Sequence, residues 1–283
     1  MNATNKFSAE TKLINDIIAD SPSWAAQTLK EWDNNNFRRR VPFASEIHWS
    51  GQQSINVFDV VGTAQPDYQG MSWLTFLAQG KQMGKNLLLQ DQNPDYYLTD
   101  GIKLPAMYYI SIDGGGWYVA KSDGNHRTCI ARFMFHQMGR TMLHGVNLVS
   151  YRTDMQALAA FQRLRAEVLK NRLPVIVSPH RRTLSHETTP SGLREHCEVR
   201  IRVEDTETGR SELLTPTEAD AYTERIIVSQ NSGGMLAKFF NKLTRGKNEK
   251  RINQEHSAGQ KTCFVVYPGG ISFDCRWLRL FGP

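Results

Sequence analysis

The chain has few cysteines and no long apolar run, and both absences narrow the classes of protein it can belong to. Cys129, Cys197, Cys263 and Cys275 include no CxxC pair, so the sequence predicts neither a disulfide framework nor a zinc ribbon. No stretch approaches the roughly 18 apolar residues of a membrane span. The N-terminus lacks a basic start followed by an apolar run. We therefore expect reduced, buried thiols in a soluble, cytoplasmic protein with no membrane partner.

The charge balance is only mildly basic. The 283 residues include 34 Lys and Arg against 28 Asp and Glu, a net charge of +6, and 40% of the chain is hydrophobic. A globular chain of this size can build one large domain or two ordinary ones. The excess positive charge favours a polyanionic partner, because Lys and Arg gain affinity by releasing counterions from phosphates. Many metabolic enzymes are equally basic, so charge alone leaves both classes open.

Apolar spacing predicts helices at the N-terminal end of the chain. Residues 9–20 and 23–32 have helical periodicity, and a third helix is expected over 72–83. The run NNNFRRR, which ends at Arg40, breaks the pattern. Residues 55–61 are typical of a strand.

The middle of the chain has the clearest pattern. The stretch GIKLPAMYYISID predicts a turn and a strand, the glycines at 114–116 a hairpin, and WYVAKSD the returning strand. A helix follows, and Gly139 is its stop signal. Its buried stripe is expected to contain Ile130, Phe133, Met134 and Met138. A strand over 146–151 and a long helix that is capped by Thr153 or Asp154 and reaches Lys170 complete this part.

The composition changes at the segment SPHRRTLSHETTPSG, which is rich in Ser, Thr, Pro and His, as loops and linkers are. We therefore expect an N-terminal helical extension over 1–40, a main domain over 41–173 and a smaller C-terminal α+β domain over 190–283. The last part should contain the alternating strand CEVRIRVED, a short helix near 217–223, a basic helical piece over 235–242 and two closing apolar runs.

The stretch from Asp123 to Thr128, DGNHRT, joins a strand to a helix and predicts an anion site. The first amides of a helix have no intrahelical partner, and the helix dipole adds positive charge there. Gly124 would let a phosphate approach the backbone, Arg127 offers a planar fork of donors, and His126 could donate or shuttle a proton. The alternative interpretation is that Asp123 caps the helix and the other side chains satisfy local carbonyls.

The order of GIKLP, strand, glycine hairpin, second strand, DGNHR and apolar helix resembles the ParB/sulfiredoxin superfamily over residues 40–151. In ParB-like chains a G-x-x-x-P-I element precedes the strand and a GERR element opens the helix; residues 101–105 and 124–127 occupy those places here. The resemblance implies an α/β (α+β) fold, a small mixed sheet with flanking helices that binds a nucleotide, ATP or CTP. The expected nucleotide-binding residues are Gly124, Asn125, His126, Arg127 and Thr128.

Two departures from the superfamily patterns narrow the chemistry. Sulfiredoxins need a cysteine immediately before the histidine, where this chain has Asn125, and Cys129 lies one helical turn later. The ParB clamp has Glu and Arg in place of Asn125 and His126, and we see no helix-turn-helix after the module. Sulfiredoxin chemistry and chromosome segregation are therefore disfavoured. The superfamily also includes plasmid-borne relatives that cleave DNA and kinases of free serine.

The favoured hypothesis is a nucleotide-binding, DNA-acting protein of plasmid or mobile-element type, with nuclease or NTPase activity that could use Mg²⁺ or Mn²⁺. A hydrolase needs a carboxylate, and the nearby ones are Glu46, Asp113 and Asp123. The expected catalytic residues are Glu46, Asp123, His126 and Arg127, and no residue is assigned as a metal ligand. The side chains expected to bind DNA phosphates are Arg38, Arg39, Arg40, Arg163, Lys170, Arg181 and Arg182.

Two alternatives stay open. In a small-molecule kinase, Glu46 or Asp123 would accept the substrate hydroxyl proton, while His126 and Arg127 would stabilise the transferring phosphoryl group. The surplus of basic segments outside the pocket disfavours this alternative. In a non-catalytic binding protein, the aromatic residues near the C-terminus would instead form an interface.

Overall fold

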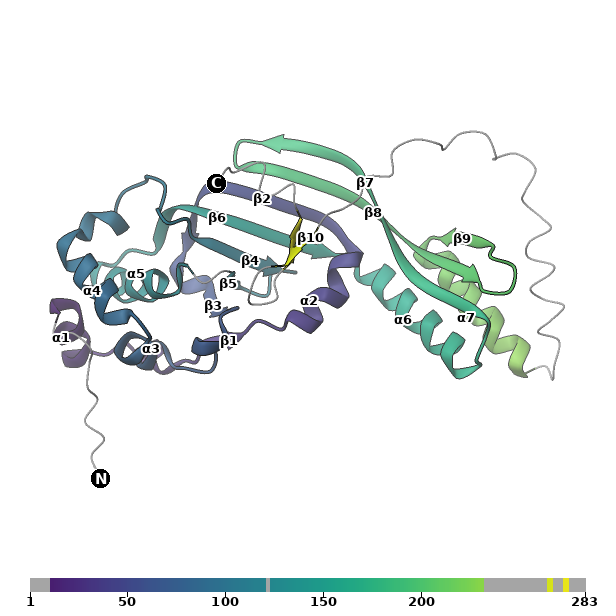
Figure 1. Ribbon diagram of the computed structural model, residues 1–283, viewed down its shortest axis with the longest axis horizontal. Helices are drawn as coiled ribbons and strands as arrows, with labels where there is room; N and C mark the ends of the chain where they lie inside the picture. Colours follow the sequence, from purple (N-terminus) through teal and green to yellow (C-terminus); the bar gives the residue numbers. More distant parts are fainter. Residues whose placement is uncertain (1–10, 121–122, 232–263, 267–271, 275–283) are drawn as a thin grey trace, which may run out of the picture.

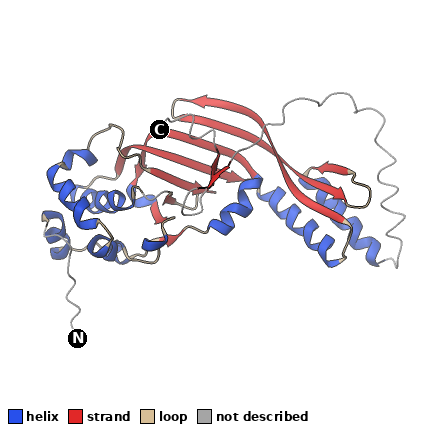
Figure 2. Ribbon diagram, in the orientation of Figure 1, coloured by secondary structure: helices blue, strands red, loops and turns tan. Residues whose placement is uncertain are grey.

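The computed structural model describes residues 11–120, 123–231, 264–266 and 272–274 (Figure 1). Within these ranges the chain has a mixed α/β fold, as expected, with seven α-helices and a nine-stranded mixed sheet (Figure 2). None of the helices in the described part combines the length and apolarity that crossing a bilayer requires.

The large sheet contains both parallel and antiparallel neighbours. Its order is β1 (Lys30–Glu31), β3 (Val60–Thr63), β5 (Trp117–Val119), β4 (Tyr108–Ile112), β6 (Met142–Thr153), β2 (Ala44–Asn56), β8 (Gly192–Asp205) and β7 (Val175–Thr189), and β9 (Ser211–Leu214) also pairs with β8. The parallel pairs are β1 with β3, β3 with β5 and β4 with β6; the other pairs are antiparallel. A separate antiparallel pair joins β10 (Phe264–Val266) to β11 (Ser272–Asp274).

Four helices gather at one end of the sheet, and α5 lies at the centre of their shared core (Figure 1). They are α1 (Lys12–Ala19), α3 (Trp73–Gln79), α4 (Met83–Gln92) and α5 (Asn125–Met138). Ile130 and Phe133 of α5 are buried with Phe76, Leu87 and Tyr109, because apolar side chains three or four positions apart share one helix face. This packing holds the N-terminal turn of α5 against the sheet.

A buried arginine crosses the core of this end. The Nη1 atom of Arg132, on α5, donates to the carbonyl oxygens of Val57 at 2.9 Å and Val60 at 3.0 Å. Its guanidinium also stacks on Trp24 and Trp73, 4.7 and 4.6 Å from the ring centroids. Burial lowers the pKa of Arg132 to about 10. The side chain therefore stays charged at neutral pH and joins α5 to the segment before β3.

The long hairpin of β7 and β8 connects the main sheet to a second core. Near its start β8 pairs with β2, from Ser50 with Gly192 to Glu46 with His196, and near its end it pairs with β9. Helices α6 (Met155–Lys170) and α7 (Pro216–Asn231) cover this far part of the hairpin (Figure 1). Leu164, Ile201, Leu214 and Tyr222 are among the residues buried there.

The expected linker is therefore wrong. The segment from Ser178 to Gly192 lies mostly in β7 and pairs with β8 over its length. Its Ser, Thr and His side chains are compatible with a strand because one or both faces of this ribbon are accessible to solvent. The boundary expected between 173 and 190 thus falls within one continuous sheet.

Three other expectations near the N-terminus are also wrong in detail. Residues 23–32 are not one helix: the main chain of Leu29 bonds to Met71 and leads into β1. The run NNNFRRR is a helix, α2 (Asn34–Arg40), because the side chain of Asp33 accepts from the Asn36 amide and caps it. The helix expected over 72–83 ends before Gly80, and α4 follows as a separate helix.

Several expectations are confirmed and some boundaries shift. The sequence patterns correctly place the hairpin of β4 and β5, helix α5, and strands β6 and β8. They also place helix α6, which Asp154 caps. Met138 is 46% exposed and so does not belong to the buried stripe of α5. The short helix expected near 217–223 extends over all of α7. Cys129 and Cys197 are buried free thiols; the helical piece expected over 235–242 lies outside the described residues.

Candidate functional site

The turn that opens α5 is built on a glycine. Gly124 is the N-cap residue, is buried and has a φ of 109°, a left-handed conformation that other residues adopt only with strain. A Cβ built there would also contact Val119 and Met107, at 3.5 and 3.6 Å. The cap position follows Asp123, so the interpretation of Asp123 as the helix cap is wrong. By helix geometry, the first amides of α5 lack intrahelical acceptors.

Two buried polar side chains attach this turn to the sheet. Asn125 is 1% exposed, and its Oδ1 accepts from the Thr63 hydroxyl at 2.6 Å. Thr128 donates through Oγ1 to the Gly124 carbonyl at 2.7 Å and lies 2.7 Å from the Tyr109 hydroxyl. Asn125 and Thr128 thus position the turn against β3 and β4, and their side chains already have partners within the protein.

His126 packs into an aromatic environment beside the turn. Its Nε2 lies 3.2 Å from the Tyr68 hydroxyl, and its ring lies against those of Tyr68 and Phe76. Burial lowers the pKa of His126 below its usual 6.5, although a hydrogen bond to the Lys81 backbone opposes the shift. His126 is therefore mainly neutral at pH 7, and its ring already has polar partners in Tyr68 and the Lys81 backbone.

Arg127 holds the GIKLP loop next to the turn. Its Nη1 donates to the Pro105 carbonyl at 2.6 Å and to the Tyr96 hydroxyl. In the same loop the buried Lys103 donates to the carbonyls of Thr99 at 2.7 Å and Gly101 at 3.2 Å. Nη1 of Arg127 thus satisfies a local carbonyl, as the alternative interpretation supposed, while Nε and Nη2 carry the other three donors of the fork.

The structure separates the three candidate carboxylates. Asp123 is exposed at the turn. Asp113 instead accepts from the Thr153 amide and hydroxyl, at 2.6 and 2.8 Å, and from Arg40. Glu46 lies on β2, four strand spacings from β3, a separation of about 19 Å across the sheet. Of the three, only Asp123 lies beside the first turn of α5.

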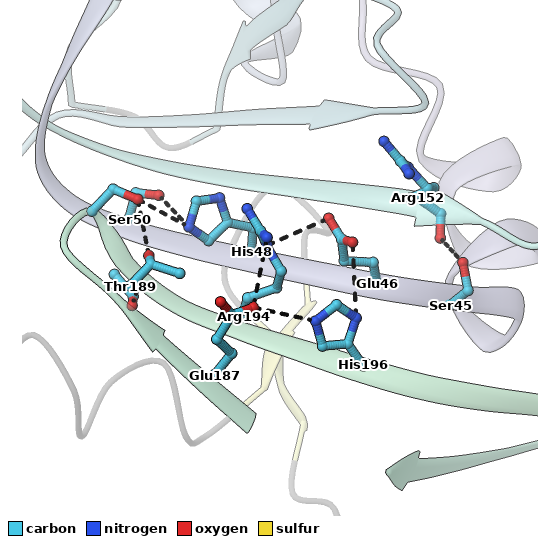
Figure 3. A network of polar contacts seen from close by, with 11 residues as sticks. Ser45, Glu46, His48, Ser50, Arg152, Glu187, Thr189, Arg194 and His196 are labelled. Carbon is cyan, nitrogen blue, oxygen red and sulfur yellow. Dashed lines mark hydrogen bonds and ion pairs between the residues drawn. The ribbon is translucent and has the colours of Figure 1, made fainter. Parts of the chain in front are cut away.

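Glu46 belongs to a second polar cluster on an open face of β2, β8 and β7 (Figure 3). Arg194 and His196 lie between two carboxylates. The Glu46 oxygens lie 3.8 Å from Nε of Arg194 and 3.9 Å from Nδ1 of His196. An oxygen of Glu187 lies 3.7 Å from Nη1 of Arg194 and 3.6 Å from Nε2 of His196. Nearby, His48 Nε2 is 3.2 Å from the hydroxyl of Ser50, and burial followed by the charge of Arg194 lowers its pKa. Among the described residues, no three His, Cys, Asp or Glu side chains are arranged to hold a metal ion.

The side chains expected to bind DNA come from three separate elements. They lie on α2, α6 and β7, and most have partners within the protein. Arg40 pairs with Asp113, Arg163 with Asp220, Lys170 with Glu167 and Arg182 with Glu198, while Arg181 donates to the Val41 carbonyl. Arg38 and Arg39 are exposed on α2. Of the set, Arg182 lies beside further arginines, those of β8.

The arginines of β8 are the functional candidates that sequence reasoning missed. Arg194, Arg200 and Arg202 alternate with buried residues along REHCEVRIR, and so they share one face of the strand. The period-two pattern was visible as a strand signal, but it also predicts a polar face. Comparison with protein-family models, with curated proteins and with solved structures finds no match to this chain.

Proposed function

We propose that this chain is a nucleotide-binding protein that acts on DNA, and that nucleotide phosphates bind at the first turn of α5. The observation that carries the proposal is the buried, left-handed Gly124, which opens a 14-residue helix without a side-chain cap. Amides at such a turn, together with the helix dipole, favour an anion. The resemblance of the DGNHR region to the ParB/sulfiredoxin superfamily supports a nucleoside triphosphate, ATP or CTP, as that anion.

The side chains around the turn fit this ligand. Asn125 and Thr128 hold the backbone in place through Thr63 and Tyr109, so the amides do not have to reorganise on binding. Arg127 contributes a fixed positive charge beside them. A bound nucleoside triphosphate would supply a hydrolysable phosphoanhydride, and Mg²⁺ or Mn²⁺ would accompany its phosphates.

A non-catalytic version of this function is the second candidate. Glu46 lies far across the sheet from the turn and Asp113 is bound to Thr153 and Arg40, so Asp123 is the one predicted carboxylate near the nucleotide. A protein that binds the nucleotide only to change its hold on DNA would need no general base there.

Calorimetry with ATP and with CTP tests nucleotide binding. Gly124→Ala introduces a Cβ and backbone strain at the turn, and its control is Gly139→Ala, at the left-handed C-cap of the same helix, where a Cβ meets open space. We expect Gly124→Ala to weaken binding at least tenfold and Gly139→Ala to leave it within about threefold. Circular dichroism establishes that both variants fold. Equal affinities of folded Gly124→Ala and wild type would refute the site.

A DNA assay then separates the two candidates. Purified protein is incubated with plasmid DNA, Mg²⁺ or Mn²⁺ and either nucleotide, and strand cleavage and phosphate release are measured. Cleavage or hydrolysis supports the enzymatic form. If the protein binds nucleotide and DNA but neither cleaves the DNA nor hydrolyses the nucleotide, the non-catalytic form is supported. If it shows no cleavage, no hydrolysis, no nucleotide binding and no DNA binding, both forms are excluded.

A further inference from the structure

The β7–β8 hairpin has one apolar face and one polar face. Val199, Ile201 and Val203 of β8 lie on the side covered by α6 and α7. The intervening side chains of Glu198, Arg200 and Arg202 project to the opposite side, since successive residues of a strand alternate. Their partners on β7 are Arg182, His180 and Ser178, each directly opposite and therefore on the same face.

Positive charge exceeds negative charge in this stretch. Glu198 accepts from Arg182 at 2.9 Å and from Arg200 at 2.7 Å, so one carboxylate is shared by two guanidinium groups. Arg202 lies 3.3 Å from Nδ1 of His180, whose pKa is lowered first by burial and then by the charges of Arg202 and Arg182. On this face, the row therefore contains the three arginines Arg182, Arg200 and Arg202 and the single carboxylate of Glu198.

Arg182 is exposed, and Arg200 and Arg202 are half-buried. The side chain of Arg182 is 59% exposed and that of Arg200 is 37% exposed. Glu204 lies beyond Arg202 and bounds the row on one side. At the other side the row continues into the cluster of Arg194 and His196, where Glu46 and Glu187 balance the charge.

Part of the hairpin is a two-stranded ribbon. The pairing of β8 with β2 ends at His196 and its pairing with β9 begins at Ile201, so residues 197–200 of β8 pair with β7 alone, while Arg202 lies where β9 has joined. The major groove of duplex DNA is wide enough to admit such a ribbon. Side chains on one face of a strand are about 7 Å apart, so Arg200 and Arg202 can reach neighbouring phosphates.

We infer that this face of the β7–β8 ribbon, with Arg182, Arg200 and Arg202 around His180, is the docking surface for the phosphate backbone of duplex DNA. The inference rests on the proposed function, which supplies DNA as the partner, and it assigns the surface that binds it. It places DNA binding on one contiguous face of the β7–β8 hairpin, instead of on the arginines and lysine of α2, α6 and β7 expected from the sequence.

Fluorescence anisotropy with a labelled duplex, over a range of salt concentrations, tests the surface on the full chain. The variant is Arg182→Gln/Arg202→Gln. The matched control is Arg140→Gln/Arg165→Gln, which removes the same charge from exposed positions after α5 and on α6. Losing two phosphate contacts should weaken binding by on the order of 50-fold at 0.1 M salt and reduce the salt slope by about 2. The control should change affinity by less than about threefold. Arg182→Lys/Arg202→Lys keeps the charge and should keep the slope.

The possible results are distinguishable. If wild type binds duplex and the Arg182→Gln/Arg202→Gln variant binds equally well with the same salt slope, the docking surface is wrong while the proposed function stands. If wild type binds no DNA, both are wrong. Preference for single-stranded DNA or RNA of the same length, in competition, would refute duplex DNA as the occupant.

Discussion

Arg40 and Asp113 form an ion pair in which Nη1 lies 2.7 Å from Oδ2, and the pair joins the end of α2 to the turn between β4 and β5. The same carboxylate accepts from the amide and hydroxyl of Thr153, at the end of β6. Asp113 has a φ of 53°, a conformation that Asp and Asn tolerate better than most residues. One carboxylate therefore fixes three elements at this end of the sheet.

Replacing Asp113 with Asn should lower the free energy of unfolding by about 1–2 kcal/mol, because the charge-assisted bonds weaken while the backbone conformation stays accessible. Arg40→Gln removes the ion pair but keeps both bonds to Thr153, so it should cost less. Urea unfolding measures both. Nucleotide affinity should not change. A large loss of nucleotide affinity in folded Asp113→Asn would show that Asp113 contributes to the nucleotide site.

Arg132→Met should destabilise the fold by about 2–4 kcal/mol, because the carbonyls of Val57 and Val60 lose a charged donor in the core. Arg140→Gln, two residues beyond the end of α5 and exposed, is the control and should lie within about 0.5 kcal/mol of wild type. Denaturant unfolding compares the two. Equal stability of both variants would show that the aromatic and carbonyl contacts of Arg132 contribute nothing net.

His126 should make the fold less stable in acid. Its pKa is lowered by burial in the folded chain, so the unfolded chain binds the proton more readily, at a pKa near 6.5. The free energy of unfolding is therefore retained above about pH 6.5 and falls as the pH drops below it. The slope is at most about 1.4 kcal/mol per pH unit for one proton, and the curve levels off below the folded pKa. Comparing unfolding of wild type and His126→Gln between pH 5 and 8 isolates this contribution, since His48 and His180 are common to both. If the free energy of unfolding of the two proteins depends on pH in the same way, His126 makes no such contribution.

The part of the fold that the sequence predicts best is the part with a repeated local signal. Helix α5 combines a glycine turn, an apolar stripe and a glycine stop, and each points to the same boundaries. Helix α2 lacks an apolar stripe, and it forms because Asp33 caps it and Phe37 is buried against Trp32. Single-residue packing of this kind has no periodic pattern to detect.

The candidate site was predictable to the same extent. Local sequence located the Gly124 turn, but the partners of Asn125 and Arg127 are Thr63 and Tyr96, 62 and 31 residues away. Only the folded chain brings them together. The placement of Glu46 failed for the same reason, because strand order decides its distance from the turn. The polar face of β8 was missed although its alternation is local.

The most direct test of the phosphate site is a titration of the isotopically labelled protein with ATP or CTP, followed through backbone amide resonances. Anion binding at the first turn of α5 predicts that the largest shifts fall on the amides of Gly124, Asn125, His126 and Arg127, and that Gly124→Ala suppresses them. Saturable shifts confined to other segments, or unchanged amides at this turn at millimolar nucleotide, would contradict the account.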